Sequence, residues 1–165
     1  MNGTTQDVKR ILVVDDNPVI LRALSLALGA RDYEVFTASD PSEALGFARL
    51  EKIDLILLDI FFPPDVDQNG MAWNAFRMIE WMQRTGMAQG VPIIIISGAE
   101  PKELRHRCLA AGAAAFFSKP LHLPDLLATI RQFLEPDEEL VEPESDLVIP
   151  PPLQPDAPLM RDIAG

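Results

Sequence analysis

The feature that most constrains this chain is an alternation between short apolar runs and longer segments with apolar residues at helical spacing. The runs are rich in Val, Ile and Leu, and Pro, Gly or Asp marks each boundary, as is typical of successive strands and helices. We expect strands over residues 10–15, 33–39, 53–60, 91–97 and 114–119. We expect helices over about residues 18–28, 41–50, 70–85, 101–111 and 124–134. The pattern therefore predicts five βα units.

Two of the expected helices begin with recognisable start signals. Asn17 stands before Pro18, and these residue types favour the N-cap and the first helical position. Asp40 likewise precedes Pro41, and Glu43 follows Asp40 by three residues, which is the spacing of a capping box. The second helix is therefore predicted to begin at Pro41.

The expected strands are apolar throughout, which is typical of a parallel sheet covered by helices on both faces. The predicted fold class is α/β, with an open, doubly wound sheet. Ligands of such sheets bind outside the carboxyl ends of the strands. Asp15 and Asp16 end the first strand, Asp59 the third, Ser97 the fourth and Lys119 the fifth. We expect these five side chains to meet at one edge.

Three carboxylates at one edge repel each other unless a cation holds them together. Mg²⁺ suits a cluster of a few carboxylates, whereas a tight Ca²⁺ site needs more ligands. A carboxylate can also act as a nucleophile and become an aspartyl phosphate. Lys119 would then pair with one phosphoryl oxygen, and Ser97 would hydrogen-bond another. The alternatives are an Asp pair that only caps a helix and a Ser97 that belongs to a plain turn.

Charge is divided unevenly along the 165 residues. Residues 1–134 carry 16 acids and 13 bases, whereas residues 135–165 carry 9 acids, 1 base and seven prolines. This distribution argues against direct binding to nucleic acid or to a membrane surface. The apolar runs are too short to span a bilayer, the start "MNGTTQDVKR" does not read as a signal peptide, and a lone Cys108 forms no internal disulfide. We expect a cytoplasmic protein.

The acidic, Pro-rich segment 135–165 differs in composition from the rest of the chain. Such chain buries too little apolar surface to offset its ordering entropy, so we expect it to be extended or disordered unless it docks. Its apolar islands "LVIPPPL" and "APLMRDI" could lie along this domain, along a second copy or on a partner. The predicted organisation is one domain over residues 1–134 and a tail over residues 135–165.

Over roughly residues 8–134, the chain resembles bacterial two-component response-regulator receiver domains, the CheY-like superfamily. The motifs that carry the resemblance are "VVDDNP", "LILLDI", "IIIISG" and "FFSKP". They match the family's acidic pair after the first strand, its phosphoacceptor Asp after the third, its Ser or Thr after the fourth and its Lys-Pro after the fifth. The resemblance implies a flavodoxin-like (βα)5 fold with strand order 2-1-3-4-5.

The resemblance assigns roles to the acidic residues. Asp15 and Asp16 match the pair that organises Mg²⁺, and Asp59 matches the phosphoacceptor and a further metal ligand. The backbone carbonyl of Phe61 matches another metal ligand. The loop after Asp59, "IFFPPDVDQNG", is about three residues longer than the family's usual loop.

Four further residues match family positions near the phosphoryl group. Ser97 resembles the hydroxyl that turns toward it, Lys119 the lysine that binds it, and Pro120 the proline after a cis peptide. Phe116 stands three residues before Lys119, where the family has its switch aromatic, and a core position is an equally good interpretation.

The function implied is a switch rather than an enzyme. It would accept a phosphoryl group from a sensor histidine kinase or phosphotransfer protein and signal to a downstream protein. It would act as a stand-alone receiver, either as a monomer or as a homodimer. One alternative is the receiver portion of a longer regulator or hybrid kinase. Another is a Mg²⁺-dependent aspartyl-phosphate phosphatase, although that class has a second Asp two residues after the nucleophile, where this chain has Phe61. Flavin binding is disfavoured, because no Ser/Thr/Gly-rich loop follows the first strand.

Overall fold

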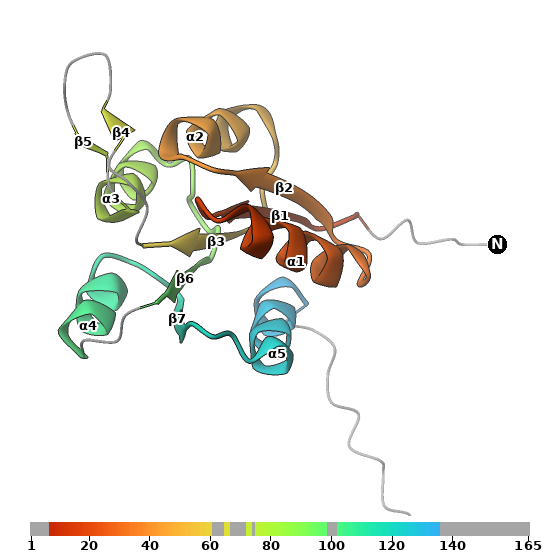
Figure 1. Cartoon of the computed structure of the whole chain (residues 1–165). Helices are drawn as coiled ribbons and strands as arrows, with labels where there is room; N and C mark the ends of the chain where they lie inside the picture. Colours follow the sequence, from red (N-terminus) through yellow and green to blue (C-terminus); the bar gives the residue numbers. More distant parts are fainter. Residues whose placement is uncertain (1–6, 61–64, 67–71, 74, 99–101, 136–165) are drawn as a thin grey trace, which may run out of the picture.

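A computed structural model describes residues 7–60, 65–66, 72–73, 75–98 and 102–135 (Figure 1). The strands are β1 (Arg10–Val14), β2 (Glu34–Ala38), β3 (Leu55–Asp59), β4 (Asp65–Val66), β5 (Ala72–Trp73), β6 (Ile93–Ser97) and β7 (Ala115–Ser118). The helices are α1 (Pro18–Gly29), α2 (Pro41–Leu50), α3 (Ala75–Thr85), α4 (Lys102–Ala110) and α5 (Leu123–Leu134).

The main sheet has five strands in the order β2-β1-β3-β6-β7, and every neighbouring pair is parallel. Numbered within this sheet alone, the order is 2-1-3-4-5, so the prediction of a doubly wound, flavodoxin-like (βα)5 fold is confirmed. The order reverses between β1 and β3, where ligands of such sheets bind.

The core consists of two apolar clusters. Helices α1 and α5 lie on one face of the sheet, and α2, α3 and α4 lie on the other (Figure 1). Ile11 and Val13 of β1 belong to the cluster that contains α1 and α5 residues, whereas Leu12 and Val14 belong to the cluster that contains α2, α3 and α4 residues. Successive side chains of a strand point to opposite faces, so both faces of a covered strand must be apolar. This explains why the strands are continuous apolar runs in the sequence.

The predicted helix starts are observed at α1 and α2. The Asn17 side chain accepts a hydrogen bond from the Val19 backbone N–H at 2.9 Å. The Asp40 side chain accepts from the Glu43 N–H at 2.8 Å, and the Glu43 carboxylate accepts from the Ser39 N–H at 2.8 Å. Each cap satisfies N–H groups that lack a partner within the helix. The chain therefore turns sharply from the carboxyl end of a strand into the next helix.

One predicted helix boundary was wrong. The helix expected from about residue 70 begins at Ala75, because Ala72 and Trp73 form β5 and pair antiparallel with Val66 and Asp65 of β4. Ladder hydrogen bonds to β4 require extended backbone at these residues, which excludes a helix there. The buried residues of α3 are Ala75, Met78, Ile79 and Met82, at helical spacing.

Cys108 of α4 is buried in the same cluster as α2 and α3, as expected of a small apolar side chain. Burial raises the pKa of its thiol. Within the part of the chain that the structure describes, no helix combines the length and the hydropathy that crossing a bilayer requires. The predicted tail lies outside the described residues from residue 136 onward.

Candidate functional site

Polar side chains stand at the carboxyl ends of four neighbouring strands of the sheet. Asp15 follows β1, Asp59 is the last residue of β3, Ser97 is the last residue of β6, and Lys119 follows β7. The pairing of β6 with β7 continues to this edge, where the Lys119 backbone N–H donates a hydrogen bond to the Ser97 carbonyl at 2.7 Å. Because the strands are parallel and adjacent, residues far apart in the sequence meet at one edge.

Three carboxylates form a compact cluster at this edge. Asp15, Asp16 and Asp59 each offer an oxygen within 4.8 Å of the others. Asp15 and Asp59 are buried, with 1% and 4% of their surface exposed, whereas Asp16 is exposed. The Asn17 backbone N–H donates to Asp15 Oδ1 at 2.8 Å and fixes that carboxylate. These hard oxygen donors suit Mg²⁺, so this acidic pocket could hold the metal.

The Lys119 side chain reaches into the same cluster. Its Nζ lies 2.7 Å from Asp15 Oδ2 and 3.1 Å from Asp59 Oδ2. Burial lowers the pKa of Lys119, but hydrogen bonds and charge attraction from Asp15 and Asp59 outweigh it, so the pKa is raised. The ammonium is therefore charged at neutral pH. Three carboxylates and one ammonium have a formal charge of minus two, which a divalent cation would neutralise.

Ser97 of β6 and Phe116 of β7 are the remaining residues singled out on the strands next to β3 and β6. The Ser97 side chain has no exposed surface, and its residue follows Ile96, the β6 partner of Asp59. Phe116 of β7 is 7% exposed and packs in the cluster on the α2, α3 and α4 face, with the Arg105 guanidinium 5.9 Å from its ring centroid. Phe116 is thus a core residue in this structure, and Arg105 links it to α4.

The structure brings most of the residues singled out in the sequence together at one edge. The Lys119–Pro120 peptide bond is cis. Phe61, whose carbonyl was predicted to be a metal ligand, lies outside the described residues. Sequence reasoning missed Arg105, because nothing in the local pattern of α4 indicates a contact with a ring on β7. The Arg105 contact depends on how α4 packs against the sheet.

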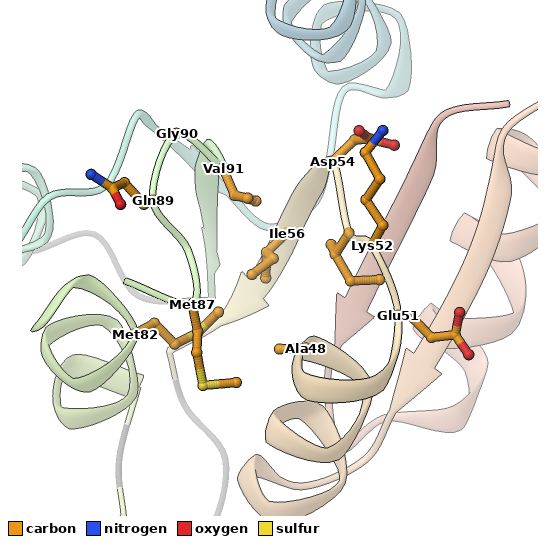
Figure 2. Close-up of a pocket in the computed structure, with 11 residues that line it drawn as sticks. Ala48, Glu51, Lys52, Asp54, Ile56, Met82, Met87, Gln89, Gly90 and Val91 are labelled. Atoms are coloured by element: carbon orange, nitrogen blue, oxygen red, sulfur yellow. The ribbon is translucent and has the colours of Figure 1, made fainter. Parts of the chain in front are cut away.

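A separate pocket lies at the opposite end of the strands, near the start of β3 (Figure 2). Its volume is about 340 Å³, and its polar lining includes Glu51, Lys52 and Asp54 after α2. These residues already have partners: Glu51 and Asp54 contact Arg10, and Lys52 contacts Asp7. This pocket shares no residue with the carboxylate cluster.

A doubly wound parallel sheet with three clustered aspartates and a lysine at its carboxyl edge defines a signalling domain of the receiver class. Comparison with known families agrees: the model of the response regulator receiver domain matches residues 11–131. The chain belongs to the response regulator receiver domain family of two-component signalling.

Some curated relatives are matched over nearly their whole length, and others over only a part. The response regulator PleD of Caulobacter vibrioides is 34% identical over 122 residues, which cover 74% of this chain and 25% of PleD. The polar-differentiation response regulator DivK of Brucella anthropi is 27% identical over 126 residues, which cover 76% of this chain and 96% of DivK. The chain spans only 13% of the Salmonella typhi sensor histidine kinase RcsC and 56% of the Aneurinibacillus migulanus response regulator GtcR.

Solved structures share the fold. A CheY-like receiver domain protein from Methanospirillum hungatei JF-1 is 31% identical, with a TM-score of 0.68 over 79% of this chain and 96% of that chain. The chemotaxis protein CheY4 of Vibrio cholerae is 26% identical, with a TM-score of 0.68 over 78% of this chain and 100% of that chain.

Proposed function

We propose that this chain is a phosphorylation-dependent switch in which Asp59 accepts a phosphoryl group from a phosphohistidine. The donor would be a sensor histidine kinase or a phosphotransfer protein, and the location would be the cytoplasm. The observation that carries the proposal is the position of Asp59: its carboxylate is buried at the switch point of the sheet, beside Asp15 and Lys119. A buried carboxylate with an adjacent fixed cation is suited to act as a nucleophile toward phosphorus.

In the proposed reaction, an Asp59 oxygen forms a bond to phosphorus as the P–N bond of the phosphohistidine breaks. The electron pair of that bond returns to the imidazole nitrogen, which leaves with the donor protein. Lys119 already lies 3.1 Å from Asp59 and would pair with a phosphoryl oxygen, while the Ser97 hydroxyl would donate to another. Asp15, Asp16, Asp59 and the Phe61 carbonyl would hold Mg²⁺, which offsets negative charge on the phosphoryl group when bound.

The signal would pass from Ser97 and Phe116 to a downstream protein. Ser97 ends β6 immediately before the segment that leads to α4, and Phe116 contacts α4 through Arg105. A phosphoryl group that draws the Ser97 hydroxyl toward it would bias the position of this segment, so that a partner or a second copy contacts a changed surface. Direct binding to nucleic acid is not part of this function.

We propose a stand-alone receiver, and the coverage of 96% of DivK supports this arrangement. The alternative, a receiver within a longer regulator or hybrid kinase, is supported by the low coverage of PleD and RcsC. The family match and the Phe61 position both favour a switch over an aspartyl-phosphate phosphatase.

The proposal is tested by measuring intact mass after incubation with acetyl phosphate and Mg²⁺. The wild-type chain is expected to gain one phosphoryl group, and a chelator should prevent the gain. Asp59→Asn should gain none, because an amide is not a nucleophile of this kind. The matched control is Asp32→Asn, an exposed residue with φ of 62°, where Asn is well tolerated. Stable phosphorylation of Asp59→Asn would refute the assignment.

A further inference from the structure

A groove separates the end of α5 from the connection between α1 and β2. It has a volume of about 430 Å³ and is lined by Arg31, Tyr33, Leu127, Ala128, Arg131 and Glu135. Because Tyr33 directly precedes β2 and Leu134 ends α5, the groove lies at the amino end of the sheet, away from the aspartate cluster. It is therefore a different surface from the proposed phosphorylation site.

The groove already binds one carboxylate of this chain. Glu135 accepts a hydrogen bond from the Tyr33 hydroxyl at 3.3 Å and pairs with Arg131 Nε at 3.2 Å. Burial, followed by the charge and the hydrogen bond of Glu135, raises the pKa of Tyr33. Arg31 contributes a second guanidinium, whose Nη1 donates to the Ala27 carbonyl at 2.8 Å and so stays near the end of α1. The groove thus combines two cations, a phenol and the exposed apolar side chain of Ala128.

Glu135 is also the residue at which the acidic segment of the chain begins. Residues 136–146 read "PDEELVEPESD" and contain six acids and no base, with Leu140 and Val141 between the acids. Their charge complements the two arginines, and their apolar pair would pack beside the exposed Ala128. The segment directly follows Glu135, which lines the groove, so no linker has to be spanned. A ligand tethered this closely has an effective concentration in the millimolar range, which makes weak contacts sufficient.

We propose that residues 136–146 of this same chain dock in the groove between α5 and the α1–β2 connection and cover Arg31 and Arg131. The pocket near the start of β3 has two acids and one base in its lining, which disfavours an acidic ligand. Among the described residues that line the groove, Arg31 and Arg131 are the two cations, and the docked tail would screen both from acidic partners.

The experiment is ¹⁵N relaxation of the full chain at low ionic strength. Docking is expected to keep the backbone order parameters of residues 137–146 above about 0.6, since values below about 0.6 indicate flexible backbone. The double substitution Arg31→Glu and Arg131→Glu should lower them below 0.6. The matched control Arg84→Glu reverses an exposed charge on α3, on the other face of the sheet, and should leave them unchanged. Wild-type chain in about 1 M salt, where the Debye length is about 3 Å, should behave like the double variant.

Three results would overturn the proposal. Order parameters below 0.6 in the wild type at low salt would mean that the tail is free of the groove. Equal values in the wild type and the double variant would mean that the arginines do not hold it. Restraint that disappears on dilution would place the tail on a second copy, because docking within one chain does not depend on concentration. The salt comparison needs no substitution, so it stands even if the double variant folds poorly.

Discussion

Replacing Lys119 with methionine tests how much the ammonium group contributes to stability by pairing with the carboxylate cluster. Met keeps an unbranched apolar stem and removes the charge that lies 2.7 Å from Asp15 and 3.1 Å from Asp59. The two carboxylates would then remain buried, with side-chain exposures of 2% and 5%, beside each other and beside Asp16. We expect the variant to fold and to be markedly less stable than the wild type in a buffer without divalent cations.

The expected loss follows from burial. Removing one partner of a buried ion pair costs about 3–5 kcal/mol, because the remaining charge has lost both water and its counter-ion. The Lys119 side chain is 20% exposed, so water can enter the space that it leaves. We therefore expect the lower end, about 3 kcal/mol. At about 2–4 °C per kcal/mol for a domain of this size, the Tm should fall by roughly 6–12 °C.

The assay is urea denaturation at neutral pH with a chelator present. The matched control is Lys52→Met, which removes an ion pair with Asp7 whose side chains are 72% and 84% exposed. Exposed pairs contribute about 0–1 kcal/mol, so this variant should stay close to the wild type. Adding Asp15→Asn to Lys119→Met should recover about 1 kcal/mol or more, because it removes one unpaired carboxylate. Equal losses for Lys119→Met and Lys52→Met would refute the reasoning, as would a further loss on adding Asp15→Asn.

Two further predictions concern the groove and the tail. Tyr33 is the only tyrosine, so tyrosinate absorbance should report a pKa above the ordinary value of about 10, and Glu135→Gln should lower the midpoint while burial keeps part of the shift. Because the pKa of Tyr33 is higher in the folded than in the unfolded state, this phenol stabilises the fold below about pH 10, and that contribution is lost as pH rises through the folded pKa. An unchanged titration midpoint of Tyr33 in Glu135→Gln would contradict the contact with Glu135. A chain ending at Glu135 should melt within about 2–4 °C of the full chain, since exposed charge contacts contribute about 1 kcal/mol at most; a larger loss in a thermal scan would show that the tail is part of the core.

The local features of the fold are readable from the sequence because they depend on neighbouring residues. Apolar runs identify strands that are covered on both faces, and Asn17 and Asp40 cap helices through N–H groups two and three residues away. Because the ends of parallel strands share an edge, the sequence also indicates which polar residues meet there. The helix boundary at residue 75 was missed, since the extended backbone of β5 depends on its pairing with β4.

Only the tertiary structure decides the contacts between distant segments. Lys119 touches Asp15 across 104 residues of sequence because β1, β3, β6 and β7 lie side by side in step. The contact of Arg105 with Phe116 and the groove around Tyr33 depend on how helices pack on the sheet. The positions of these helices result from the packing of many side chains in both core clusters. A hydrogen bond or an ion pair requires its two groups to lie within a few ångströms of each other, and no local residue pattern specifies a helix position that closely.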